Sequence, residues 1–183
     1  ETQKKRFHSV DPAPALTLER GNHNRHHNDD DDGGSGRKDF HEDSGISVES
    51  LTQTLRDRRL ALFERYRALF ALRDRGGDEA VQALSTAFRD PSAVLKHEVA
   101  FVLGQMQHPR AVACLASLLK NATEHAMVRH EAAEALGAIS NPECVALLKR
   151  FSSDTDQLVR ESCEVALDMC EQWSLGGAVP SGG

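Results

Sequence analysis

A repeat of 31 to 33 residues constrains the fold of this chain more than any other feature. The pairs Ala71-Leu72, Val102-Leu103, Ala135-Leu136 and Ala166-Leu167 follow one another at spacings of 31, 33 and 31 residues. Around them apolar residues recur mostly at steps of three and four, which is typical of a helix with one buried face. A single unit of this kind cannot bury its apolar face alone, so neighbouring units must stack. The sequence therefore predicts an all-α fold, an α-solenoid of about four helical-hairpin repeats.

The turns between the predicted helices are marked by Gly76-Gly77, His108-Pro109 and Asn141-Pro142. Gly supplies a positive φ and Pro fixes the entry to the next helix. The first helical pattern runs without a clear break from Leu51 to Tyr66, and Gly-rich sequence follows Trp173. We expect the fourth unit to lack a full second helix, with the repeat arm at 49–173 and a flexible tail at 174–183.

Residues 1–48 show little periodicity and are rich in His, Asn, Asp, Gly and Ser. Such a composition cannot bury enough apolar surface to offset the entropy of ordering, so we expect a disordered linker. The run with His23, His26, His27 and the acidic residues 29–32 could adsorb a divalent cation weakly, although a polar linker explains it equally well. Because the chain opens on Glu1, we expect a fragment or a processed product, whose upstream targeting signal would not be visible.

The composition excludes several functions. A formal net charge of −6 argues against a general nucleic-acid binder, and no apolar run approaches the roughly 20 residues that cross a membrane. The four cysteines form no CxxC pair and lie within helical patterns, so we expect buried free thiols and a cytoplasmic protein. No pattern typical of a nucleophilic enzyme or a phosphate-binding loop is present.

The dipeptide His-Glu recurs at one matched position of the two middle repeats, as His97-Glu98 and His130-Glu131. The first repeat has Tyr66-Arg67 there and the fourth has Glu161-Ser162, so the repeat does not need His-Glu to fold. Stacked helices lie about 8–10 Å apart, so His97 and His130 can converge on one ion. The glutamates point about 100° away from their own histidines and need not share that ion. Imidazole and carboxylate without thiolate favour iron, manganese or zinc.

Four side chains are few for a closed site with two metal ions, so these pairs make up only part of such a site. Duplication of a repeat can also copy residues that have no function, and a single His-Glu usually lies on a solvated helix face. The main alternative is therefore an α-solenoid that binds a protein partner without catalysis. A repeat-built lyase or chaperone for a tetrapyrrole-bearing protein is a third, less favoured possibility.

The sequence around these pairs resembles the HEAT-like repeats of the deoxyhypusine hydroxylases. The similar strings are residues 63–73, 96–105, 127–139 and 159–169, within a resemblance that covers about residues 55–173. Residues 9–14 are similar to the segment that joins the two halves of such an enzyme. The resemblance implies that this chain is the C-terminal arm together with the linker between the arms.

The resemblance also implies a function. The family hydroxylates the deoxyhypusine side chain of translation factor 5A with dioxygen, at two Fe(2+) ions held between two arms with two His-Glu pairs each. By this analogy His97 and His130 bind one iron, and Glu98 and Glu131 reach toward the other iron or the substrate. Met127 would lie near the mouth of the substrate site.

Two departures from the family pattern qualify this expectation. The N-terminal arm is not part of this sequence, so we expect the chain to be inactive without that arm. Residues 18–46 form a His/Asp-rich insertion that does not match the family. The acidic balance of the chain agrees with a cationic, amine-bearing substrate.

Overall fold

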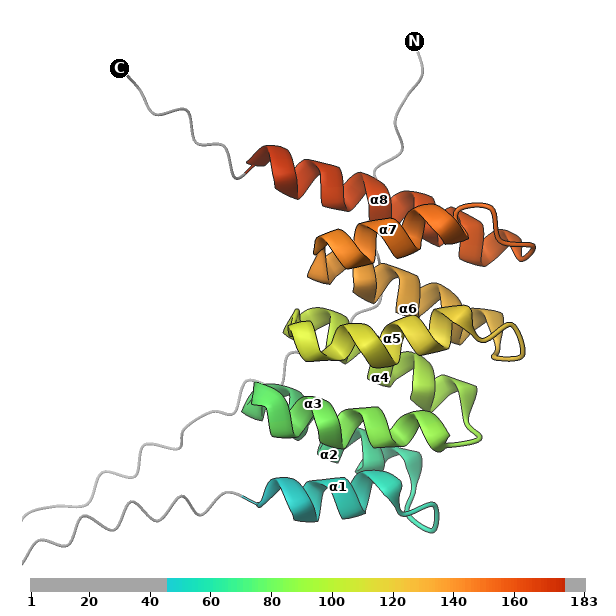
Figure 1. The fold of residues 1–183 in the computed structure, drawn as a ribbon. Helices are drawn as coiled ribbons and strands as arrows, with labels where there is room; N and C mark the ends of the chain where they lie inside the picture. The colour runs from blue at the N-terminus through green and yellow to red at the C-terminus, as the bar shows by residue number, and fades with distance from the viewer. Residues whose placement is uncertain (1–45, 177–183) are drawn as a thin grey trace, which may run out of the picture. The chain divides into compact units, whose positions relative to one another are not determined.

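The computed structural model describes residues 46–176 of the chain. This part forms eight α-helices and no strand (Figure 1). The helices are α1 (Val48–Arg56), α2 (Leu62–Arg75), α3 (Gly77–Ser85), α4 (Ala93–Met106), α5 (Val112–Lys120), α6 (Ala126–Ile139), α7 (Pro142–Phe151) and α8 (Gln157–Gly176). Two short 3-10 turns, η1 (Thr86–Arg89) and η2 (Pro109–Ala111), precede α4 and α5. The prediction of an all-α chain is confirmed.

The helices stack in two layers (Figure 1). One layer holds α1, α3, α5 and α7, and the second layer holds α2, α4, α6 and α8. Each helix of the first layer packs against the helix that follows it in the chain, so four helical hairpins succeed one another. Fully buried leucines of both layers, such as Leu103, Leu115 and Leu136, join a single core. The predicted α-solenoid of about four hairpins is confirmed.

The hairpins begin one helix earlier than the sequence predicts. We expected one long helix from Leu51 to Tyr66, but the chain breaks between α1 and α2. The Asp57 carboxylate accepts a hydrogen bond from the backbone N–H of Arg59 at 3.0 Å, and the Glu64 carboxylate accepts one from the N–H of Ala61 at 3.2 Å. These contacts satisfy the ends of two separate helices. The fourth hairpin is then complete, because α7 packs against α8.

The first and last described helices mark the ends of the arm. The Ser47 hydroxyl caps α1, so the arm begins at Val48, and α8 continues to Gly176, three residues beyond the predicted end of the arm. The predicted disordered linker, apart from residues 46–48, lies outside the described residues, as do its His/Asp-rich run and residues 177–183 of the predicted tail.

The cysteines agree with the prediction from the sequence. All four are free, and Cys144, Cys163 and Cys170 are buried. Burial raises the pKa of the Cys163 thiol to about 12, so it stays protonated and unreactive near neutral pH.

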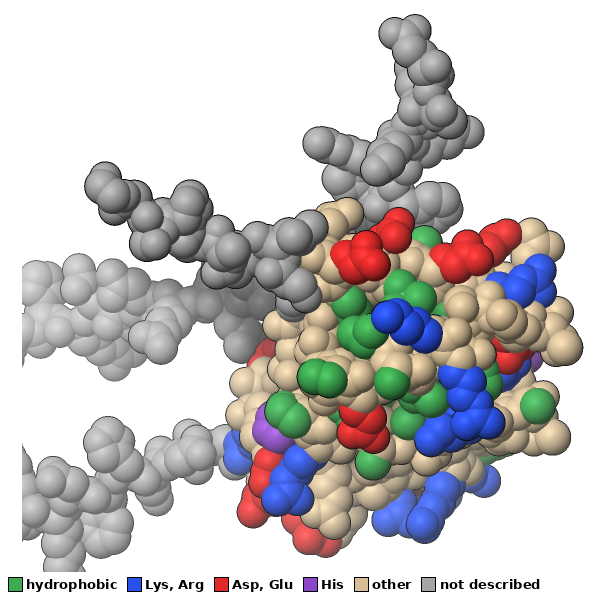
Figure 2. Space-filling view, turned by 45° about the horizontal axis from the view of Figure 1, so that its top comes forward, with side chains coloured by type: hydrophobic (Ala, Val, Ile, Leu, Met, Phe, Trp, Pro, Cys, Tyr) green, Lys and Arg blue, Asp and Glu red, His purple; other side chains and the backbone are tan. Residues whose placement is uncertain are grey.

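None of the described helices has the length and apolar character that a membrane crossing requires. On the face shown in Figure 2, hydrophobic side chains lie in small groups between charged residues of both signs.

Two glycines let neighbouring helices of the second layer approach closely. A Cβ atom on Gly104 of α4 would lie 2.9 Å from the Ala135 Cα atom of α6. A Cβ atom on Gly137 of α6 would lie 2.6 Å from the Ala166 Cβ atom of α8. Both distances are shorter than a normal contact, so these positions require glycine.

We therefore predict that Gly137→Ala destabilises the chain. An open helical position would gain about 1 kcal/mol from this change, but overpacking against Ala166 should give a net loss of about 1–3 kcal/mol in the free energy of unfolding. Urea denaturation followed by circular dichroism measures this difference. Adding Ala166→Gly should restore part of the loss, and a stabilised single variant would contradict the close approach.

A series of buried ion pairs connects successive hairpins. Arg129 donates to the Leu119 carbonyl at 3.1 Å and to Asp154 Oδ1 at 3.1 Å, and its side chain and that of Asp154 are buried. Arg65 makes the same contacts with Leu55 and Asp90. Lys96 occupies the matching position in α4 and pairs with Glu124. In the first three hairpins the basic residue before the His-Glu position therefore joins one hairpin to the loop of the next.

Replacing one partner of such a pair should be costly, because it leaves the other charge buried without its partner. We predict that Arg129→Met lowers the free energy of unfolding by about 3–5 kcal/mol. The matched control is Arg59→Met, since Arg59 pairs with Asp57 on the surface. Equal losses for the two variants in urea denaturation would show that the Arg129 pair does not join the hairpins as described.

Candidate metal centre

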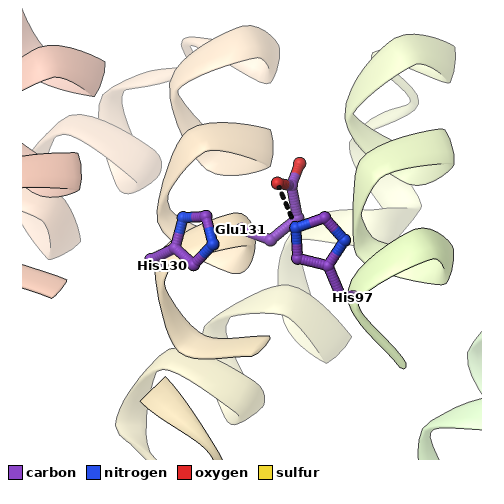
Figure 3. A group of neighbouring side chains, drawn as sticks. All are labelled: His97, His130 and Glu131. Carbon is purple, nitrogen blue, oxygen red and sulfur yellow. Dashed lines mark ion pairs between the residues drawn. The ribbon is translucent and has the colours of Figure 1, made fainter. Parts of the chain in front are cut away.

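The candidate site lies between two adjacent helices of the second layer. His97 projects from α4, and His130 and Glu131 project from α6 (Figure 3). The Ser92 hydroxyl caps α4, and the His125 ring caps α6 by accepting from the Met127 N–H at 3.1 Å. Each helix therefore begins about one turn before its histidine, at a residue that fixes the start of the helix.

The structure brings three of the four predicted ligand residues together. His97, His130 and Glu131 each offer one ligand atom, and these atoms lie within 4.8 Å of one another. The two imidazole rings have their centroids 5.4 Å apart. The predicted convergence of His97 and His130 is therefore seen in the geometry.

Glu131 lies closer to the histidines than the sequence suggested. Its Oε2 is 3.1 Å from Nε2 of His97 on the neighbouring helix (Figure 3). The reason is the helical register: Glu131 lies one turn before Ala135, on the edge of α6 that contacts α4. The glutamate thus turns away from its own histidine and toward the histidine of the preceding repeat.

The cluster is largely shielded from solvent and carries charge. The side chain of Glu131 is 8% exposed and that of His97 is 22% exposed. The hydrogen bond to Glu131 raises the pKa of His97, and the negative charges of Glu98 and Glu134 raise it further. Burial of the ring lowers this pKa, but the net shift is upward. A cation is therefore favoured at this place, whether it is a proton or a metal ion.

Glu98, the fourth predicted ligand, faces the other side of α4. It is half-buried, and its negative charge adds to burial in raising the pKa of Tyr66 on α2. Glu131 and Glu98 thus act on matched residues, because Glu131 pairs with His97 and the charge of Glu98 acts on Tyr66, each at the histidine position of the preceding second-layer helix. Glu98 is therefore not part of the three-residue cluster.

Met127 lies one helical turn before His130 and Glu131 in α6 and is half-buried. The matching positions of the other second-layer helices also carry apolar side chains, namely Phe63, Val94 and Leu158, which are 71%, 53% and 42% exposed. We call these four residues the apolar row. The row was not predicted from the sequence, although its members repeat at the same spacings as the buried pairs.

Two further residues near the cluster were not predicted. Glu134 Oε1 lies 3.3 Å from Nδ1 of His130, and the Ser162 hydroxyl of α8 donates to the same oxygen at 3.2 Å. The hydrogen bond from His130 is the main reason why the pKa of Glu134 is lowered. The spacing of four residues from His130 to Glu134 could have indicated this contact, but nothing local in the sequence points to Ser162.

Two imidazoles and one carboxylate form a donor set that suits Fe(2+) and leaves coordination positions open for dioxygen or a substrate. Zn(2+) and Mn(2+) accept the same donors. No thiol takes part among the described residues, because the four cysteines lie apart from this cluster. The donor atoms of His97, His130 and Glu131 therefore suit a metal ion that carries out redox or hydrolytic chemistry, and they do not suit a metal that requires thiolate ligands.

We predict that Glu131→Gln lowers the pKa of His97. The pKa of His97 in the folded chain lies above the ordinary value of about 6.5 for a histidine. The His97–Glu131 pair therefore stabilises the folded chain fully below about pH 6.5, and this stabilisation is lost as the pH rises through the raised pKa of His97. NMR titration of the His97 ring measures the shift, and the variant should lose this pH dependence of unfolding. The control is Glu143→Gln, which changes an exposed glutamate. If His97 had the same pKa in Glu131→Gln as in this control, the proposed His97–Glu131 interaction would be contradicted.

Comparison with known proteins supports the architecture of stacked helical repeats and indicates a more specific group of relatives. The sequence matches the model for HEAT repeats over residues 48–122 and 83–168. It is 53% identical over 171 residues to deoxyhypusine hydroxylase of Arabidopsis thaliana, covering 93% of this chain and 46% of that protein. It is 46% identical over 169 residues to the enzyme of Eremothecium gossypii, covering 92% of this chain and 45% of that protein.

A solved structure agrees with these matches. The structure of human deoxyhypusine hydroxylase in complex with glycerol superposes with a TM-score of 0.67 at 54% sequence identity, over 69% of this chain and 44% of that chain. The chain spans about half the length of the curated relatives it matches. The chain thus belongs to the HEAT-repeat family and is a relative of the deoxyhypusine hydroxylases.

Proposed function

We propose that this chain is the C-terminal arm of a two-iron monooxygenase that converts the deoxyhypusine side chain of translation factor 5A to hypusine. The observation that carries the proposal is the convergence of His97, His130 and Glu131 within 4.8 Å in a relative of the deoxyhypusine hydroxylases. The matched half-length supports the assignment to one arm of a longer enzyme.

In this proposal His97, His130 and Glu131 hold one Fe(2+). Glu98 lies on the opposite edge of α4 and would reach the second iron or the substrate. When bound, the iron supplies the reduction of dioxygen: one oxygen enters a C–H bond, and the other leaves as water with two electrons from an external reductant. The protein residues hold the metal, keep bulk water away and orient the amine-bearing side chain.

The exposed face of the second layer supports a role for another arm. The apolar row defined above follows one side of the cluster across all four helices. Val165 is 46% exposed on the other side, and Phe70 and Phe101 are half-buried at matching positions. Apolar side chains flanking a buried polar cluster are typical of a surface that another protein covers. The N-terminal arm is the proposed occupant.

The charges near the cluster suit a polyamine-like substrate. Glu98, Glu131 and Glu134 all lie near enough to His97 for their charges to raise its pKa, and Met127 lies one turn before His130 and Glu131. Carboxylates attract the ammonium groups of deoxyhypusine, while apolar neighbours contact its methylene groups. This surface gives no reason to propose a nucleic acid or a membrane as a partner, and the free cysteines are compatible with the cytoplasm as the proposed location.

We predict that His97→Ala or His130→Ala, in the protein that contains both arms, abolishes iron binding at this arm. Hydroxylation of the translation factor should fall by more than about 100-fold, because a ligand is lost and not only a supporting contact. Iron content by elemental analysis and hypusine formation by mass spectrometry measure the two effects. His108→Ala is the control, since His108 caps η2 and pairs with Asp78 outside the cluster.

The alternative binding module makes the opposite prediction. Protein prepared without oxygen in the presence of Fe(2+) would then contain no iron, and its partner would bind equally well with or without a chelator. Unchanged iron content and turnover in the histidine variants would also refute the proposed site. The isolated arm should be inactive in either case.

A further inference from the structure

The structure assigns Glu134 as a positioning residue: together with Ser162, it fixes His130 with the proton on Nδ1, so that Nε2 is the nitrogen available to the candidate centre. This inference deepens the proposed function and rests on it only for the identity of the metal. It begins with the way neighbouring helices of the second layer face one another.

Two matched positions of the second-layer helices meet between α4 and α6, where His97 of one helix pairs with Glu131 of the next. In α2 and α4 these positions hold Tyr66 and Glu98, and the charge of Glu98 raises the pKa of Tyr66. In α6 and α8 they hold His130 and Ser162. At this third junction, therefore, the glutamate position is occupied by a serine, which offers no carboxylate.

Glu134 supplies the missing carboxylate from the histidine's own helix. Its Oε1 lies 3.3 Å from His130 Nδ1, and Ser162 Oγ donates to this same oxygen at 3.2 Å. The Ser162 residue is 6% exposed, so its hydroxyl holds Glu134 from a buried position. The carboxylate is thus fixed between α6 and α8.

Packing does not explain a carboxylate at this position. The corresponding residues of the other three repeats are Phe70, Phe101 and Val165, all apolar. Glutamate occurs here only in α6, and the next second-layer helix has Ser162 instead of a carboxylate at the glutamate position. Like the His-Glu pairs, Glu134 is therefore not required by the packing of the repeat.

The hydrogen bond determines the tautomer of His130. An ionised carboxylate only accepts hydrogen bonds, so the Nδ1 atom beside it must carry the proton. In the neutral ring Nε2 then keeps its lone pair. A histidine that binds a metal commonly donates its other N–H to a carboxylate in this way, which orients the ring and makes the ligand nitrogen more basic.

The first test measures the tautomer directly and needs no iron. At alkaline pH, where the imidazole is neutral, the 15N chemical shifts of the His130 ring should show the proton on Nδ1 in the wild-type chain. In Glu134→Ala the proton should move predominantly to Nε2, the favoured tautomer of a free imidazole. Ser162→Ala should give an intermediate mixture. If the 15N shifts of the His130 ring were unchanged in Glu134→Ala, Glu134 would not determine the tautomer and the positioning role would be overturned.

The second test measures Fe(2+) affinity in the protein with both arms, by anaerobic titration. Glu134→Ala should weaken binding about 10- to 100-fold, and Glu134→Gln should weaken it less, because its amide oxygen still accepts from Nδ1. The matched control is Glu49→Gln, an exposed glutamate that pairs with Gln53 four residues away. An affinity in Glu134→Ala within twofold of wild type would contradict a role in metal binding.

The two tests separate the inference from the proposed function. If the wild-type protein binds no Fe(2+) but Glu134→Ala changes the tautomer, the iron enzyme is refuted and the positioning contact stands. If the wild type binds Fe(2+) but the variant changes neither the tautomer nor the affinity, the positioning role is refuted and the enzyme proposal stands. Circular dichroism of each variant confirms that the helices remain intact.

Discussion

The close approach of α4, α6 and α8 is the constraint on which the rest of the structure depends. Gly104 lies two turns after His97, and Gly137 lies two turns after His130 on the same helix edges. Because the glycines let the helix backbones meet, Glu131 of α6 reaches His97 of α4 and Ser162 of α8 reaches Glu134 of α6. A bulkier residue at either position would separate the helices and lengthen these contacts.

The two middle repeats combine glycine with His-Glu, and the other repeats have neither. The position of Gly104 and Gly137 is occupied by Arg73 in the first repeat and by Asp168 in the fourth. Arg73 bridges instead to Gln105 of α4 at 3.0 Å, and α2 packs less extensively on α4 than α4 does on α6. Close packing and the candidate ligands thus occur in the same repeats, as a short distance between His97, His130 and Glu131 requires.

Stability and chemistry are divided between the two sides of each second-layer helix. The basic residues Arg65, Lys96 and Arg129 face inward and join successive hairpins through buried ion pairs. The next residue along the chain turns to the exposed face, where His97 and His130 lie. One step along a helix therefore separates a residue that holds the stack together from a residue of the candidate metal centre. A polar cluster can persist on this face because the ion pairs and the leucine core stabilise the scaffold independently of it.

The sequence by itself determined the all-α solenoid, its repeat length and the histidines that meet, because periodic apolar residues and matched positions repeat with the helices. It did not determine where the hairpins begin, since the break between α1 and α2 depends on local contacts of Asp57 and Glu64 that apolar periodicity does not show. Nor did it show that Glu131 joins His97 or that Ser162 supports Glu134. These contacts connect residues 34 and 28 positions apart on different helices, so only the distance and rotation between packed helices decide them.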